Sequence, residues 1–359
     1  MIMAYTAEER ALIWLAACSG LEERDCARLL QEAKNPLSLF EETEKFLPRV
    51  IKEAPKRLYN SNRAKREAQL NDFLRELDDK GYFAVTLRSA DYPARLKCIP
   101  DAPPVLYGKG RRELLKEQAF CIVGSRVTPP WAAEQAKKIA GELARQFVIV
   151  TGFAEGGDRA AIDGALPSGN LICVLPHGLD GCYPAAHASL KKRVAEAGLL
   201  LSEYLPEEQV RKFSFHERNR ILAGMGAGVL VVSAGERSGT AITARYASEF
   251  SREVFAFPYN VGSRQGVGCN ELIKKGASLV TDAQDILSVY GFEKQEESSV
   301  LLSDEENRCL AALRDAGELH VSQIAERAGM QIFEAAAVMS SLEMKGLAVK
   351  AGGNRYTAL

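Results

Sequence analysis

The sequence predicts an α/β protein built on a Rossmann-like, doubly wound parallel sheet, with an N-terminal helical domain and a C-terminal winged-helix domain. Short apolar runs alternate with helical segments through the middle of the chain, the start shows only helical patterns, and the end shows helical segments followed by a hairpin signal. We expect a SAM-like or helix-hairpin-helix-like domain over 1–75, a core over 76–291 that opens with an extended segment, a linker over 292–300 and a winged helix over 301–359.

The N-terminal region has clear helix signals. Thr6 followed by Glu9 predicts a capping box at the start of the first helix. A second amphipathic helix is expected over 21–33, before an Asn-Pro pair. The stretch 52–67 is rich in Lys and Arg, and we expect a solvated basic face there, with contact to a polyanion as the alternative.

The segment 82–110 differs from its surroundings, because it holds four prolines and two short β-rich runs. It predicts an extended connection that adds an edge strand to the sheet. Beyond it, apolar runs separated by helical segments predict βαβ units. The strands expected from these runs are residues 120–123, 147–150, 171–175, 199–201, 229–232, 254–257 and 278–280.

Ligands of an open parallel sheet bind beyond the carboxyl ends of its strands, so the loops there are the candidate site. The first loop begins Gly124-Ser125-Arg126. Gly124 allows a tight turn, and Ser125 and the free N–H groups of the following helix are expected to hold an anion. Arg126 adds a bidentate grip on a phosphate oxygen. The alternative is a capped turn with a surface arginine.

The second loop carries Thr151, Gly152 and Gly156, and its glycines would let a backbone approach a ligand closely. Glu155 and Asp158 would repel a phosphate unless they face away. Neither this loop nor the first has the glycine spacing of a dinucleotide or ATP site.

Two further groups lie beside later loops. Aromatic and basic residues before the fifth parallel strand fit phosphates and stacked bases, and they fit equally well as a structural cluster: Phe215, Arg218, Asn219 and Arg220. The hydroxyls and amides of Ser238-Gly239-Thr240 offer another anion site at a helix start. Several such loops along one sheet edge favour a polymer over a single nucleotide.

Residues 82–287 resemble the DNA-processing protein A family (DprA, also called Smf). The matching segments occur in the family's order: DYPARLKCIPDAPPVLYGKG, CIVGSR, VIVTGFAEGGD, GLDGCYP, LLSEY, FSFHERNRILAG, SGTAITARYASEFSREVFAFP and GCNELIKKGASLV. The helical start and the winged-helix end also resemble accessory domains of that family.

The resemblance implies a protein that binds single-stranded DNA with little sequence preference, forms homodimers, and helps to load the RecA recombinase onto DNA taken up in natural transformation. The motifs carry a phosphate-binding role to Arg126 and a place beside or lining its pocket to Arg218, Asn219, Arg220, Ser238, Gly239 and Thr240.

Several positions depart from the family pattern. They are Thr151 for Ser, Glu155 for a residue that is often basic or small, Gly157 for Ile, Ile162 for His, and Tyr259 for the Gly of a Pro-Gly pair. Ala185 stands where DNA-binding members carry a basic residue, and Lys191 and Lys192 are candidates to replace it. These departures lower the DNA affinity that we expect.

The charge of the last domain favours a protein partner. Residues 301–359 carry six basic and eight acidic side chains, and the candidate recognition helix 331–345 has a single lysine. A winged helix that binds duplex DNA needs several cationic phosphate contacts. We therefore expect protein contact or an auxiliary role.

Composition limits the remaining function classes. The net charge of −1 excludes a uniformly basic nucleic-acid coat, and no Cys-x-x-Cys or His-Glu-x-x-His spacing predicts a metal. We expect no cofactor, no catalytic residue, no membrane span and a cytoplasmic location. A nucleotide N-glycosidase-like enzyme is the weaker alternative, because no carboxylate closely follows Ser238-Gly239-Thr240. A nucleotide or second-messenger sensor also stays open.

Overall fold

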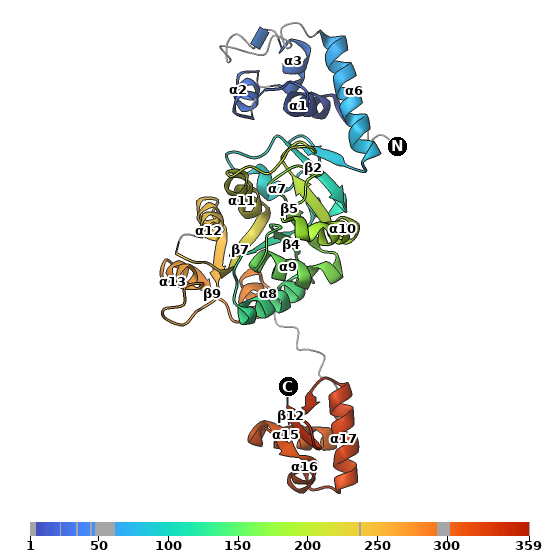
Figure 1. Ribbon diagram of the computed structural model, residues 1–359, viewed down its shortest axis with the longest axis vertical. Helices are drawn as coiled ribbons and strands as arrows, with labels where there is room; N and C mark the ends of the chain where they lie inside the picture. Colours follow the sequence, from blue (N-terminus) through green and yellow to red (C-terminus); the bar gives the residue numbers. More distant parts are fainter. Residues whose placement is uncertain are drawn as a thin grey trace. The chain divides into compact units, whose positions relative to one another are not determined.

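The computed structural model describes residues 5–21, 23–33, 35–43, 45–46, 62–236, 238–292 and 302–358 (Figure 1). The chain forms two compact units, Met1–Tyr290 and Gly291–Leu359.

The N-terminal helices of the first unit are α1 (Ala7–Ala17), α2 (Glu23–Ala33), α3 (Pro36–Glu41) and α6 (Arg63–Asp79). The predicted capping box is confirmed, since Glu9 N donates to Thr6 Oγ1 over 3.3 Å and Thr6 N donates to Glu9 Oε2 over 2.7 Å. Of these helices, α1 contacts the edge strands β1 and β2, and α6 contacts β1 (Figure 1). Helix α6 continues through the boundary expected at residue 75.

The expectation of a solvated basic face is wrong for Arg66. Its side chain is buried, and its guanidinium carbon lies 5.8 Å from the Trp14 ring centroid and 6.0 Å from that of Phe40. Arg66 Nη2 also donates to the Glu41 carbonyl over 2.8 Å. The cation therefore holds α6 to the first helices. Residues 52–61 of that stretch lie outside the described residues.

A nine-stranded sheet forms the centre of this unit, in the order β1-β2-β6-β5-β4-β3-β7-β8-β9. Its strands are β1 (Phe83–Thr86), β2 (Val105–Gly110), β3 (Ala119–Gly124), β4 (Val148–Thr151), β5 (Leu171–Val174), β6 (Leu199–Ser202), β7 (Gly226–Ser233), β8 (Glu253–Ala256) and β9 (Ser278–Leu279). From β6 to β9 every neighbouring pair is parallel, whereas β2 runs antiparallel to β6 and to β1. The predicted parallel strands are confirmed, and the proline-rich segment contributes two strands at one edge.

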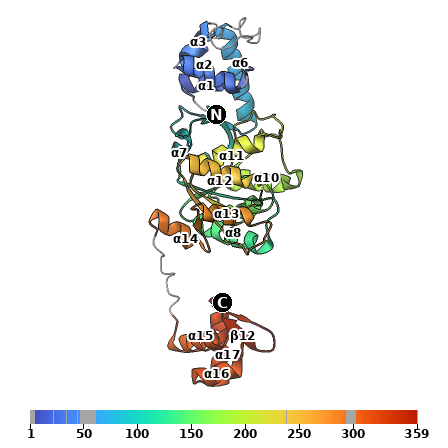
Figure 2. The ribbon, with the colours of Figure 1, turned by 90° about the vertical axis from the view of Figure 1, so that its left-hand side faces the viewer.

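Helices cover both faces of the sheet. They are α7 (Ala94–Lys97), α8 (Pro130–Leu143), α9 (Gly157–Ala165), α10 (Ala188–Ala197), α11 (Ser214–Met225), α12 (Thr240–Glu249), α13 (Val267–Lys274) and α14 (Ala283–Leu287). Side chains alternate along β3 as expected for a strand buried on both faces. Cys121 packs toward α11 and α12, which lie side by side in Figures 1 and 2, while Phe120 meets Phe147 and Phe255 on the opposite face.

The sheet reverses its direction of growth at β3. The chain adds β4, β5 and β6 on one side of β3 and then returns to add β7, β8 and β9 on the other. Such a reversal opens a crevice beyond the carboxyl ends of the two strands that flank it. The topology therefore places the loops that follow β3 and β7 around one crevice.

The second unit has the winged-helix outline. It contains α15 (Asp304–Ala316), α16 (Val321–Ala328), α17 (Ile332–Met344), β10 (Leu319–His320), β11 (Ala348–Lys350) and β12 (Arg355–Ala358), with the strands in the order β10-β12-β11. The predicted helices and hairpin are confirmed. Gly352, Gly353 and Asn354 turn the hairpin with positive φ angles. The expected linker lies almost wholly outside the described residues.

Candidate functional site

A pocket of about 350 Å³ occupies the crevice at β3 and β7. Most of its lining comes from the loop after β3, one face of α11 and the start of α12, and Ala154 and Asp158 complete it. It brings together the sequence-predicted residues Gly124, Ser125, Arg126, Phe215, Arg218, Asn219, Ser238, Gly239 and Thr240.

Arg126 is an exposed cation at this pocket. Its guanidinium carbon lies 4.8 Å from the Phe215 ring centroid and 5.7 Å from that of Tyr183. The two rings meet edge to face at 5.5 Å. No carboxylate of the described residues forms an ion pair with Arg126. A planar cation held against aromatic rings keeps its hydrogen-bond donors available to an anion.

Helix α11 explains which residues of the aromatic-basic cluster reach the pocket. Phe215, Arg218, Asn219 and Leu222 follow one another at spacings of three, one and three residues, so they share one helix face. The helical period turns Arg220 about 200° away from Arg218.

Arg220 accordingly lies outside the pocket. It is buried and forms ion pairs with Glu203 at 2.6 Å and Asp101 at 3.0 Å. The prediction that Arg220 joins the phosphate site is therefore not met by its geometry. Its cation is compensated by two carboxylates that join α11 to neighbouring loops.

Arg218 and Asp158 form a buried charged centre beneath the pocket. Arg218 Nη1 donates to the Val174 carbonyl at the end of β5. Asp158 accepts from the backbone N–H of Gly124 over 3.3 Å and of Ala154 over 3.4 Å. Burial lowers the pKa of Arg218 and raises that of Asp158, while each charge favours the ionised form of the other. This pair fixes the loops after β3, β4 and β5 relative to α11.

The polar groups of Ser125, in the loop after β3, are bonded to other groups of the protein. Ser125 N donates to Ser233 O over 3.0 Å, and Ser125 Oγ donates to Val127 O over 2.7 Å. The expectation that Ser125 itself donates to an anion is therefore wrong for these two groups. Pro129 is the N-cap of α8 and Pro130 lies in its first turn.

The third wall is the start of α12. Thr240 N donates to Ser238 Oγ over 3.2 Å, and Ser238 Oγ donates to Thr240 Oγ1 over 3.0 Å. Asn219 Nδ2 donates to the Gly239 carbonyl over 3.2 Å, which holds this loop against α11. The positive end of the α12 dipole faces the pocket from here. Asn219 thus positions this wall.

The residues predicted after β4 support the pocket from behind. Thr151 is buried, and its hydroxyl donates to Ile122 O over 2.7 Å. A Cβ at Gly152 would lie 2.1 Å from Asp158 Oδ2. Gly156 has φ +74°, and a Cβ there would lie 2.2 Å from Ser125 O. These residues allow close packing under the pocket and do not line it.

Lys191 and Lys192 also lie outside the pocket. Lys191 Nζ donates to the carbonyl oxygens of Leu179 and, over 2.5 Å, Gly181. Burial lowers the pKa of this ammonium. Lys191 therefore holds the loop that carries Tyr183, while Lys192 is exposed beside Glu196 at 4.0 Å.

Glu155 does not oppose an anion in the way its position suggested. Its Oε1 lies 2.7 Å from Nε2 of His187, a buried side chain before α10. Three residues at or beside the pocket are not among the predicted binding residues: Tyr183, Lys212 and His216. The basic pair directly before the aromatic-basic cluster was the available signal for Lys212.

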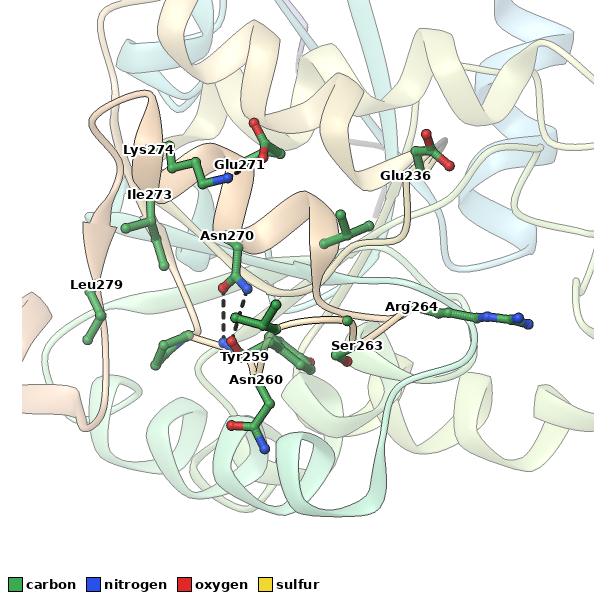
Figure 3. A pocket seen from close by; sticks show the side chains of 14 residues that line it. Glu236, Tyr259, Asn260, Ser263, Arg264, Asn270, Glu271, Ile273, Lys274 and Leu279 are labelled. Carbon is green, nitrogen blue, oxygen red and sulfur yellow. Dashed lines mark hydrogen bonds and ion pairs between the residues drawn. The ribbon is translucent and has the colours of Figure 1, made fainter.

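A second hollow, of about 750 Å³, lies beyond β8 (Figure 3). The loop after β8 and helix α13 form its walls, and Asn270 joins them by accepting from Tyr259 N over 3.0 Å and donating to Tyr259 O over 2.9 Å. Val261, Ile273 and Leu279 give it an apolar surface, of which Val261 is fully exposed. It contains no residue of the predicted phosphate-binding loops.

Within the described ranges, no three His, Cys, Asp or Glu side chains are grouped as metal ligands. No helix among the described residues combines the length and apolar character needed to cross a bilayer.

Comparison with known proteins matches both units. The family model of DNA recombination-mediator protein A matches residues 83–291, and the model of the DprA winged helix domain matches residues 293–354. The DNA processing protein DprA of Streptococcus pneumoniae is 43% identical over 202 residues, which cover 56% of this chain and 72% of the relative.

Two solved structures share the fold. The X-ray structure of DprA from Streptococcus pneumoniae has a TM-score of 0.65 and 34% identity, covering 80% of this chain and 98% of that one. DNA processing protein A from Helicobacter pylori, in a structure that describes its single-stranded DNA binding mode, has a TM-score of 0.53 and 30% identity, covering 58% and 95%.

Proposed function

Because the chain belongs to the DNA recombination-mediator protein A family, which includes proteins named DprA and Smf, we propose that it binds single-stranded DNA and mediates recombination. Its task would be to help load a RecA-type recombinase onto DNA taken up in natural transformation, in the cytoplasm. One observation carries the proposal: Arg126 stands exposed against Phe215 and beside Tyr183 at the mouth of the crevice.

The contacts that this geometry offers suit any nucleotide sequence. The guanidinium of Arg126 would bind a backbone phosphate, with Lys212 adding a second exposed cation. The faces of Phe215 and Tyr183 would stack on bases. Phosphate charge and base faces are common to all nucleotides, so we expect binding with little sequence preference and a strong dependence on salt.

We propose that the pocket is a binding site without catalysis. The two oxygens of Asp158 are engaged by the Gly124 and Ala154 amides, in a buried place suited to holding loops. Helix α12 has no carboxylate before Glu249, so the start of the helix supplies no acid–base group to the pocket. Release of free base from nucleoside monophosphates would contradict this part of the proposal.

We propose that a second copy of the chain is one partner, as the resemblance to the family implies. The apolar hollow at Val261, Ile273 and Leu279 supports this, since exposed apolar surface of this kind is typical of an interface (Figure 3). Sedimentation of Leu279→Asp should show a shift toward monomer relative to the wild type. An unchanged mass would place the dimer surface elsewhere.

For the winged-helix unit we propose a protein partner. Its α17 exposes Ile332, Phe333 and Met344, whereas a helix that enters the DNA major groove needs polar and cationic side chains. The recombinase and a second copy are both candidates for this contact.

The deciding experiment is titration of a fluorescently labelled oligothymidylate with the full-length protein at two salt concentrations. We expect saturable binding that weakens with salt and that resists competition by duplex DNA. A nucleoside monophosphate that displaces the oligonucleotide at equal nucleotide concentration would favour the sensor instead. Absence of oligonucleotide binding at low salt would refute the proposal.

A further inference from the structure

One tryptophan of this chain is exposed. Trp14 is 1% exposed in the core of the N-terminal helices, whereas Trp131, in the first turn of α8, is 52% exposed. Trp131 comes five residues after Arg126, on the same sheet edge. A large aromatic ring left in solvent beside a predicted binding site is a candidate contact for a ligand.

The Trp131 ring is held in place from below. It lies 4.9 Å from the Tyr259 ring, and its plane is inclined by 27° to that of buried Phe257 at 6.3 Å. Tyr259 is fixed in turn, because its hydroxyl donates to Val232 O over 2.7 Å. A pre-positioned aromatic surface loses little entropy when a base stacks on it.

A cation accompanies the ring pair. Arg264 is exposed in the same loop as Tyr259, and no carboxylate of the described residues pairs with it. In Figure 3 its side chain extends away from the other residues of the hollow. The Gln265 carbonyl accepts from Ala234 N over 2.9 Å, so this loop packs on the one that leads from β7 to Ser238-Gly239-Thr240.

We propose that Trp131, Tyr259 and Arg264 form a second stacking surface, which extends the single-stranded DNA path along the carboxyl edge of the sheet. This inference rests on the proposed function. The loops bearing Tyr183, Arg126 and Tyr259 follow β5, β3 and β8, which span four strand spacings. At about 4.8 Å per spacing the path is about 19 Å, the length of five or six stacked nucleotides.

Tryptophan fluorescence and oligonucleotide length test this surface together. A 12-nucleotide oligothymidylate should quench the emission of the wild-type protein in parallel with binding, and Trp131→Phe should remove that quenching. Trp131→Ala should lower the affinity for the 12-mer about 5- to 150-fold, the loss expected for one stacked base. The affinity for a 4-mer should fall by less than about 2-fold, because the Arg126 pocket can hold it alone.

A control variant and a set of named results distinguish DNA stacking on Trp131 from other roles of this residue. Val289→Ala truncates an equally exposed apolar side chain outside both surfaces and should leave both affinities unchanged. Unaltered 12-mer binding by Trp131→Ala, without quenching in the wild type, would overturn the second surface and leave the proposed function standing. Altered sedimentation of folded Trp131→Ala with normal DNA affinity would also overturn it, by assigning Trp131 to a protein interface. If neither oligonucleotide binds the wild type, the proposed function itself fails.

Discussion

Replacing Arg126 by alanine removes one exposed cation from the crevice while leaving the fold intact. The side chain touches Phe215 and Tyr183 through ring contacts, and its charge favours the ionised form of buried Asp158 less than the charge of Arg218 does. A surface substitution of this kind changes the free energy of unfolding by about 0.5 kcal/mol or less. Any change in DNA affinity therefore reports the lost contact.

The expected size follows from the exposure of the guanidinium. A hydrogen bond to a charged group contributes about 1.5–3 kcal/mol, and solvent around Arg126 favours the lower end, which corresponds to an affinity loss of about 10-fold. Losing one phosphate contact also reduces the slope of log affinity against log salt by about 0.7 for a single strand. The ratio of wild-type to Arg126→Ala affinity should therefore shrink by about 2.6-fold between 50 and 200 mM salt.

Fluorescence anisotropy of a labelled oligothymidylate over that salt range measures both quantities. Arg126→Lys should keep the salt slope and lose part of the affinity, because an ammonium retains the charge without the planar, two-pronged donor. Lys97→Ala is the matched control: Lys97 is exposed on α7, which packs at the opposite end of α11 from the pocket. A salt slope in Arg126→Ala equal to that of the wild type would refute the phosphate contact.

Three further variants test the supporting structure. Gly156→Ala should destabilise the protein by about 1–2 kcal/mol or more in denaturant unfolding, because it forces a side chain into the left-handed region against a carbonyl oxygen. Arg218→Met should lower stability by about 3–5 kcal/mol, because it leaves Asp158 buried without its cation, and adding Asp158→Asn should recover part of the loss in thermal unfolding. Hydrogen bonding from Lys345 lowers the pKa of Glu306 from 4.5 to about 2. The ionised Glu306 therefore stabilises the folded protein fully above pH 4.5, and this contribution disappears as the pH falls through 2. Calorimetry of Glu306→Gln should show a weaker pH dependence of stability in that window.

The sheet was predictable because its strands are short apolar runs separated by helices. Sequence patterns do not specify the direction of an added edge strand. The antiparallel pairing of β2 with β6 is therefore known only from the structure. Strand β10 has two residues, too few for a pattern. The Asn-Pro pair was interpreted as a stop, yet Asn35 also starts α3 by accepting from Leu37 N over 2.9 Å.

The sequence predicted the site residues correctly where a motif places an exposed side chain in a loop. It predicted them less well where the polar atoms of a side chain can bond to other groups of the protein. Arg126 reaches the pocket because the loop after β3 must lie at the sheet reversal. Ser125 lies there too, but its donors are used by Ser233 and Val127 within the folded loops. Lys191 and Arg220 bind carbonyl and carboxylate groups that are distant in sequence, so their partners depend on tertiary packing.

The edge strand β1 of the sheet limits how far this protein can be shortened from its N-terminus. Strand β1 would present unpaired backbone groups to solvent, but the Tyr5 hydroxyl accepts from the Ala84 amide over 3.0 Å, and Glu9 accepts from the Ser89 hydroxyl over 2.5 Å. A fragment that begins at the core would lose both partners and gain a bare edge, the kind of surface on which chains aggregate. The N-terminal residues therefore protect the β1 edge from pairing with other chains, and a minimal DNA-binding fragment should retain them.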